Sequence, residues 1–459
     1  MNALSRAHAT TGYLVLVLLF GGASAAGLNI NLLLQLLGAG LIGWTLAKGD
    51  SGRPQHTGLG RFFLALGLLM AVQFLPMPPG LWRMLPGREA VYQGFVTIGA
   101  DAPWLTLSLS PWHSLASFAW WIPALALFIS MRAPGGPTNR QVIIAIAAVA
   151  AISVVIGGLQ TSTGMFYFYE ITNYGEGTGF FANSNHQGSF LLCALALWGA
   201  WALGEMRAAP SIRQKFDMSV SLLAGVSLLL VAGVAVSGSL ACLVLLVPVL
   251  AALALVAKPD FRMPVALVML LALVIVAGFG AFLIFGPADN DLLAKGVLPG
   301  ISRQEFLMNG LKILGDFAPT GSGTGTFREL YRWYEDPAQV HTVYVNHAHD
   351  DLLELLIENG VFGLLALLVF LGWYVPRSWK LWGGARRNVV QLGASLVIGL
   401  ELVHSLADYP LRTAAMSSIV AIACVLMVRP ADPPRQMPRR GSRSGKSQNK
   451  GGARDMMRI

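Results

Sequence analysis

Apolar runs of about 20 residues recur along the whole chain, and they limit what it can fold into. A helix needs about 20 apolar residues to cross a bilayer, where its backbone must satisfy its own hydrogen bonds. Charged residues make up only 12% of the chain, about half the roughly 25% of a soluble domain. The sequence therefore predicts an all-α fold, a polytopic integral membrane helical bundle with about 12 transmembrane helices. The predicted spans are 11–27, 29–46, 61–76, 113–130, 141–160, 186–204, 219–237, 239–257, 264–285, 360–376, 389–407 and 411–428.

The distribution of Lys and Arg orients these spans. With the N-terminus in the cytoplasm, 24 of the 32 basic residues fall in cytoplasmic segments and eight on the outer side. Because cytoplasmic loops carry the excess of basic residues, both termini are predicted to be cytoplasmic. Residues 1–428 then form one transmembrane domain, and 429–459 form a disordered basic tail drawn to anionic membrane lipid.

Two outer segments are long enough to hold structure of their own. Residues 77–112 contain three tryptophans, which favour the membrane interface. Residues 286–359 form a segment far longer than an ordinary connector. We therefore expect the chemistry on the outer side of the membrane.

The second outer segment ends in two histidines before a helical stretch. His347 and His349 precede a run of leucines with helical spacing, and Asp350 and Asp351 stand near its start, where acids suit the helix dipole. Histidine is the side chain best suited to move a proton near neutral pH. An ordinary polar helix start has the same pattern, so from spacing alone both interpretations stay open.

Four segments carry polar motifs beside apolar spans. They are His349-Asp350 and, after nine residues, Gly360-Val361-Phe362-Gly363; Gly179-Phe180-Phe181-Ala182-Asn183-Ser184-Asn185; Arg303 with the later turn Gly321-Ser322-Gly323-Thr324-Gly325; and His404-Ser405-Leu406-Ala407-Asp408-Tyr409-Pro410-Leu411-Arg412. Together they resemble the O-antigen ligase and polymerase family, which are multi-spanning bacterial glycosyltransferases. The chain departs from the family at Asp350, where the family usually has Asn, Ser or Gln. It also lacks the Arg often found in the outer turn 237–240.

The resemblance implies roles for the histidines and asparagines. His349 is the expected general base, with Asp350 as the catalytic carboxylate that orients it, or Asp351 in its place. His347, Asn183 and Asn185 are expected to bind substrate, the asparagines through sugar hydroxyls. The alternative for the asparagines is a helix cap.

The resemblance also implies a diphosphate site built from arginines. Arg303 and Arg412 are the expected ligands, because the guanidinium fork matches phosphate oxygens. Arg328, or else Arg83 or Arg88, is expected to replace the missing family arginine. The alternatives are a surface ion pair of Arg303 with Glu305 or Asp316, and a pairing of Arg412 with Asp408.

The implied function is transfer of a glycan from an undecaprenyl diphosphate carrier to an acceptor hydroxyl at the periplasmic face of the bacterial inner membrane. With lipid A-core as acceptor the protein is a ligase, and with a second lipid-linked glycan it is a polysaccharide polymerase. We expect no cofactor, no metal and no nucleic acid partner. Two other classes stay open, a polysaccharide or anion transporter using Arg303 and Arg412, and a membrane metallohydrolase using His347 and His349.

Overall fold

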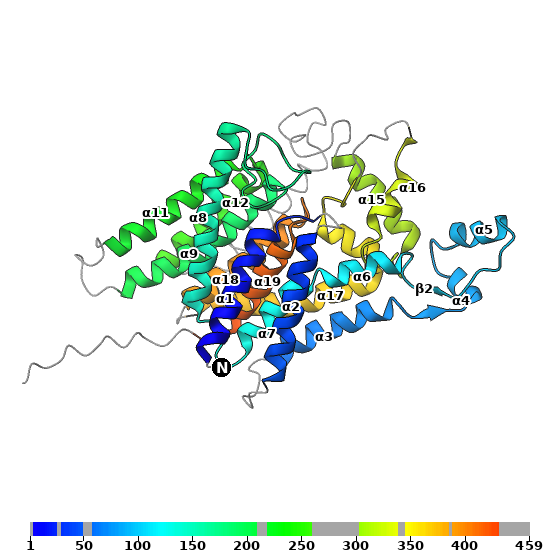
Figure 1. The fold of residues 1–459 in the computed structure, drawn as a ribbon, viewed down its shortest axis with the longest axis horizontal. Coiled ribbons are helices and arrows are strands. Elements are labelled where there is room, and N and C mark those ends of the chain that lie inside the picture. The colour runs from blue at the N-terminus through cyan, green and yellow to red at the C-terminus, as the bar shows by residue number, and fades with distance from the viewer. Residues whose placement is uncertain are drawn as a thin grey trace, which may run out of the picture.

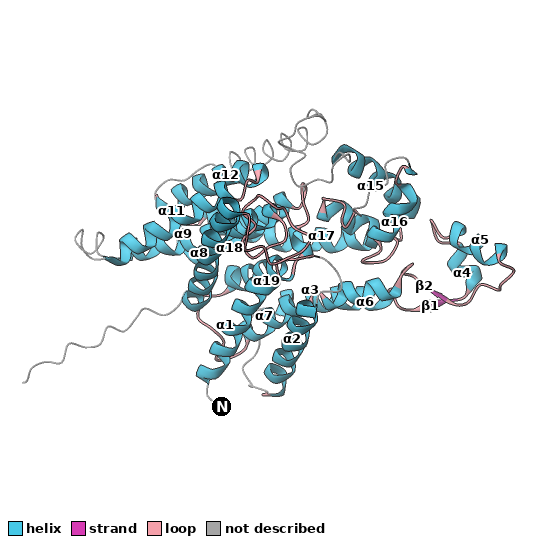
Figure 2. Cartoon of the chain, turned by 45° about the horizontal axis from the view of Figure 1, so that its top comes forward, coloured by secondary structure: helices cyan, strands magenta, loops and turns pink. Residues whose placement is uncertain are grey.

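The computed structural model describes residues 3–24, 29–48, 57–208, 218–258, 303–337, 345–384 and 388–430. These residues form a helical bundle with a single pair of two-residue strands, which confirms the all-α membrane fold (Figures 1 and 2). The predicted span 264–285, the start of the long outer segment at 286–302 and the tail beyond Pro430 lie outside the described residues.

The helices follow the apolar runs of the sequence. The apolar helices are α1 (Ala3–Phe20), α2 (Asn29–Ala47), α3 (Thr57–Val72), α6 (Pro111–Ala119), α7 (Ile122–Arg132), α8 (Asn139–Thr163), α9 (Ser184–Ala208), α11 (Met218–Val236), α12 (Leu240–Ala257), α17 (Asp351–Gly383), α18 (Val389–His404) and α19 (Ala414–Val428). The other elements, which the sequence predicts to lie on the outer side and which are called the outer elements below, are β1 (Pro76–Met77), α4 (Pro79–Arg83), α5 (Glu89–Thr97), β2 (Leu105–Thr106), α15 (Arg303–Phe317), α16 (Phe327–Tyr334) and the 3-10 helix η2 (Pro410–Arg412).

The described residues contain six helices long and apolar enough to cross a membrane and five shorter apolar helices. Each predicted span within the described residues coincides with one of them, which confirms a multi-helix membrane protein. The number of about 12 spans and their orientation stay predictions. The last long span differs most from expectation, because α17 begins at Asp351 rather than at 360 and ends at Gly383.

The core of the bundle forms around α9, which packs against α8, α11, α12 and α18. Successive side chains of α9, including Phe190, Leu191 and Ala194, are fully buried, so the helix is enclosed on all sides. A Cβ at Gly393 of α18 would lie 2.8 Å from the Ala196 carbonyl oxygen of α9. Small residues of this kind let helix backbones approach closely within a membrane.

A break in α17 joins this bundle to the outer elements. Gly360 has φ 53° and ψ −137°, so the helical hydrogen bonding is interrupted there. Two carbonyls of the preceding turn, those of Ile357 and Glu358, accept bonds from the amides of Ser322 (3.1 Å) and Gly323 (2.8 Å). The glycine-rich turn 321–325 thus satisfies backbone groups that the break leaves open.

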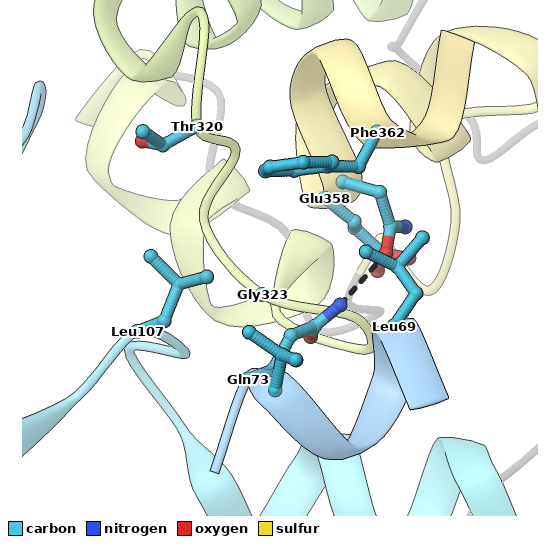
Figure 3. Close-up of a pocket in the computed structure, with 9 residues that line it drawn as sticks. Leu69, Gln73, Leu107, Thr320, Gly323, Glu358 and Phe362 are labelled. Carbon is cyan, nitrogen blue, oxygen red and sulfur yellow. Dashed lines mark hydrogen bonds between the residues drawn. The ribbon is translucent and has the colours of Figure 1, made fainter. Parts of the chain in front are cut away.

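A small pocket lies beside this break, lined by residues of α3, the glycine-rich turn and α17 (Figure 3). The side-chain nitrogen Nε2 of Gln73 donates to Thr324 Oγ1 (3.1 Å) and Asn359 Oδ1 (2.8 Å). The Gln73 Oε1 accepts from the backbone amide of Thr324 (2.8 Å). These bonds connect the residue after α3 to the glycine-rich turn and to Asn359, which directly precedes the break in α17. The glycine-rich turn is therefore packed against protein, not a free loop.

We predict that Gly360→Ala destabilises the protein by about 1–3 kcal/mol, because a side chain there is strained and overpacked. A Cβ at Gly360 would collide with the Pro319 carbonyl, at a positive φ. Gly372→Ala is the matched control on α17, since no atom lies within 4 Å of a Cβ there. The unfolding midpoints of the two detergent-purified variants measure the difference, and equal midpoints would contradict the role of the break.

The predicted orientation can be tested by cysteine labelling. The native cysteines Cys193, Cys242 and Cys424 are buried, so they give little background. In intact spheroplasts, a membrane-impermeant maleimide is expected to label Trp333→Cys, which is exposed on α16, and to spare Arg377→Cys near the other end of α17. The reverse pattern would place the outer segment in the cytoplasm.

Candidate functional site

Three segments distant in sequence meet around the ring of Tyr409. They are the turn before α17, the start of α9 and the loop between α18 and η2. Ring centroids of His347, His349 and His186 lie 4.5, 4.8 and 4.9 Å from the Tyr409 centroid. The fold therefore unites three of the four sequence motifs in one site.

His349 faces a buried carboxylate across this site. Its Nδ1 lies 3.5 Å from Asp408 Oδ1, and its side chain is 14% exposed. The ring also packs on Phe306, with centroids 5.0 Å apart. Its backbone has φ 52°, a left-handed conformation that is uncommon for residues other than glycine.

Asp408 is suited to orient His349. Burial alone would raise the pKa of Asp408, but His186 and His349, whose nitrogens lie 3.8 and 3.5 Å from its Oδ1, hold that pKa well below its usual value. An ionised carboxylate beside Nδ1 favours the tautomer with the proton on that nitrogen. Nε2 is then the nitrogen with a free lone pair, as a general base requires.

Asp350, the carboxylate predicted to orient His349, bonds the backbone of α17 in the described contacts, and its orienting role stays a prediction. Asp350 is the N-cap of α17, where its Oδ1 accepts from the amides of Leu352 and Leu353, both at 2.9 Å. Burial raises the pKa of Asp350 to about 6. Asp351, the alternative, is also engaged away from His349, with its side chain bonded to Ser405 and the Leu411 amide.

Arg412 lies among three carboxylates on one face of α17. Its nitrogens approach Asp351 at 3.3 Å, Glu354 at 3.5 Å and Glu358 at 3.1 Å. Burial opposes the charge, but these carboxylates raise the pKa of Arg412 above its ordinary value. The expected alternative, a pairing with Asp408, is wrong, whereas binding of the donor diphosphate by Arg412 stays a prediction.

Sequence reasoning missed Glu354 and Glu358, although a signal was present. Asp351, Glu354 and Glu358 are spaced three and four residues apart and so lie on one helical face. Acids at this spacing in an apolar helix indicate a buried cationic partner. His186 was also missed, and it lies directly after the Asn183-Ser184-Asn185 motif.

His347 forms a second histidine–carboxylate pair beside the first. Its Nδ1 lies 2.9 Å from Glu354 Oε1, and burial lowers the pKa of His347 against the opposing effect of that carboxylate. His347 and His349 thus face different carboxylates. Among the described residues, no three His, Cys, Asp or Glu side chains are arranged to hold a metal ion.

The asparagine motif lies at the start of α9. Asn183 Oδ1 accepts from the Asn185 amide at 2.8 Å, so the capping interpretation of Asn183 is correct. The Asn183 side chain also lies close to the Tyr409 hydroxyl, which places it at the site. The Asn185 carbonyl accepts from Cys242 Sγ at 3.4 Å. Sugar binding by either asparagine stays a prediction.

The remaining predicted arginines lie in the outer segments. Arg303 opens α15, but its side chain lies outside the described residues. Arg328 of α16 contacts Glu329 at 2.9 Å and lies 3.4 Å from His113 Nε2. Its replacement of the missing family arginine stays a prediction.

Arg88 has a structural role that makes it a poor replacement. It is fully buried and donates to the carbonyls of Pro86, Leu107 and Gly321, and burial lowers its pKa to about 10. The other alternative, Arg83, pairs with Glu89 at 2.8 Å in the exposed α4–α5 region at the edge of the molecule (Figure 1).

Comparison with known families is consistent with this site. The model of the O-antigen ligase family matches residues 224–368, which include Arg303, Arg328, His349 and the whole acidic face of α17. The chain carries an O-antigen ligase family domain. No curated protein matches it. Asp408, Arg412 and the start of α9 lie outside the matched residues and join the site through the fold.

We predict that Asp408→Asn lowers activity by about 10²- to 10⁴-fold, because an amide does not hold the His349 tautomer as a carboxylate does. Asp316→Asn is the control, since Asp316 bonds only the Tyr334 hydroxyl among the contacts described. Glycan transfer by the two purified variants measures the difference. Full activity of Asp408→Asn would contradict the prediction that Asp408 orients His349.

Proposed function

We propose that this protein is an O-antigen ligase-type membrane glycosyltransferase. It moves a glycan from an undecaprenyl diphosphate carrier to an acceptor hydroxyl in cell-surface polysaccharide biosynthesis. The observation that carries the proposal is the His349–Asp408 pair, in which Nδ1 faces a buried carboxylate. The matched family supports the reaction class.

In the proposed reaction, His349 acts on the acceptor. His349 Nε2 takes the proton from the acceptor hydroxyl while the hydroxyl oxygen attacks the anomeric carbon of the donor sugar. The bond between that carbon and the diphosphate oxygen breaks, and undecaprenyl diphosphate leaves with the electron pair. Asp408 stabilises the imidazolium that forms.

The leaving group needs cations more than it needs a proton. A diphosphate leaves readily once its developing charge is held by preorganised donors. We propose Arg303 for this role, with Arg412 and Arg328 as the further predicted cations, because guanidinium forks match phosphate oxygens. The proposed mechanism then requires neither a metal nor a nucleotide.

The acceptor is proposed to meet the site through His347 and Asn183. Both contact Tyr409, so an acceptor that reaches His349 passes close to them. Lipid A-core and a second lipid-linked glycan both present sugar hydroxyls, and both are proposed acceptors. The site is proposed to face the periplasm of the bacterial inner membrane.

The deciding experiment uses lipid-linked glycan extracted from the producing cells, with lipid A-core or the same lipid-linked glycan as acceptor. His349→Ala is expected to lose about 10²- to 10⁴-fold in transfer rate, as for loss of a general base. His347→Ala is expected to lose less, and the wild-type rate is expected to persist in EDTA.

Three outcomes would contradict parts of this proposal. Absence of covalent transfer by wild-type protein, with flux of the lipid-linked glycan in liposomes, would favour a transporter. An active His349→Ala enzyme would exclude the assigned base. Activity abolished by EDTA and restored by a divalent ion would favour metal-dependent chemistry.

A further inference from the structure

The turn that carries the proposed base has an unusual support. His347, Ala348 and His349 precede α17 without being part of it, and His349 adopts φ 52°. A left-handed residue other than glycine costs of order 1–3 kcal/mol and persists only where other contacts impose it. The contacts that impose it are therefore part of how the base is aimed.

Glu354 supplies the strongest of these contacts. Its Oε1 lies 2.9 Å from His347 Nδ1, and its Oε2 accepts from the Ala348 amide at 2.9 Å. The two partner atoms, His347 Nδ1 and the Ala348 amide nitrogen, belong to the two residues directly before His349. Asp350 is the N-cap of α17, and Glu354 lies in the first turn of that helix. A capping-box carboxylate accepts from the N-cap amide, whereas Glu354 accepts from the Ala348 amide, two residues before the N-cap.

The fold provides the charge partner that such a buried carboxylate needs. The Glu354 side chain is 2% exposed, and an unpaired carboxylate at that depth is costly. Arg412 Nη2 lies 3.5 Å away, and the same guanidinium is held by Asp351 and Glu358. Arg412 thus compensates the charge of Glu354, and Glu354 stabilises the turn through its bonds to His347 and Ala348.

We propose that Glu354 is a positioning residue, whose two carboxylate oxygens clamp the His347–Ala348–His349 turn and so aim His349 at the acceptor hydroxyl. The inference rests on the proposed function, since it presumes that His349 is the base. It adds a residue that acts through the backbone before His349 rather than by touching substrate. Asp408 holds the imidazole from the other side.

The test compares Glu354→Gln with wild type, using the lipid-linked glycan extracted from the producing cells as donor. Glutamine keeps the shape but offers one acceptor instead of two, so it cannot accept from both His347 and Ala348. We expect kcat to fall about 10²-fold, as for a slightly misplaced catalytic group, with little change in KM for the donor. Glu401→Gln is the matched control, because Glu401 is equally buried but bonds Ser189 and Cys193 within the bundle.

A double variant separates positioning from general stability. If Glu354 acts through His349, then Glu354→Gln combined with His349→Ala is expected to be no slower than His349→Ala alone. Multiplied losses, or a loss shared equally by Glu401→Gln, would overturn the inference. So would unchanged kcat in Glu354→Gln while His349→Ala is inactive, which leaves the proposed function intact. Full activity of His349→Ala would instead overturn the base assignment itself.

Discussion

The site depends on the contact between Arg412 and the acidic face of α17. Arg412 belongs to the loop after α18, and its partners Asp351, Glu354 and Glu358 belong to the start of α17. A charge buried in a membrane bundle is stable only beside opposite charge, so these segments must meet. Their meeting brings Asp408 to His349.

The break in α17 lets one helix serve two environments. Before Gly360, the helix is buried among protein and carries the three carboxylates, and after it the side chains of Val361, Phe362 and Leu365 are exposed, as expected against lipid. Irregular backbone at this depth is tolerated because the glycine-rich turn satisfies the open carbonyls. The glycines at 321 to 325 therefore support the break in α17 and, through it, the site.

The turn before α17 contributes two histidine–carboxylate pairs beside the Tyr409 ring. His349 with Asp408 is the pair whose tautomer suits a base, and His347 with Glu354 stabilises the turn between them. Tyr409 contacts both imidazoles and lies close to Asn183 before α9. Carboxylates thus surround His347 and His349, whereas Arg303 and Arg328, two of the cations proposed for the donor diphosphate, lie on α15 and α16.

The sequence by itself determined the membrane bundle, because long apolar runs with few charges can only span a bilayer as helices. It also predicted His349 as the candidate base, since that histidine stands in a motif resembling the family's. Gly360 of the same motif lies at the break in α17. Only the tertiary structure showed which carboxylate lies beside the His349 imidazole. Asp350 is adjacent in sequence but is used as a helix cap, whereas Asp408 comes from a distant loop through the pairing of Arg412 with α17. Local spacing predicts faces and caps, but contacts between distant segments depend on how buried charges are paired.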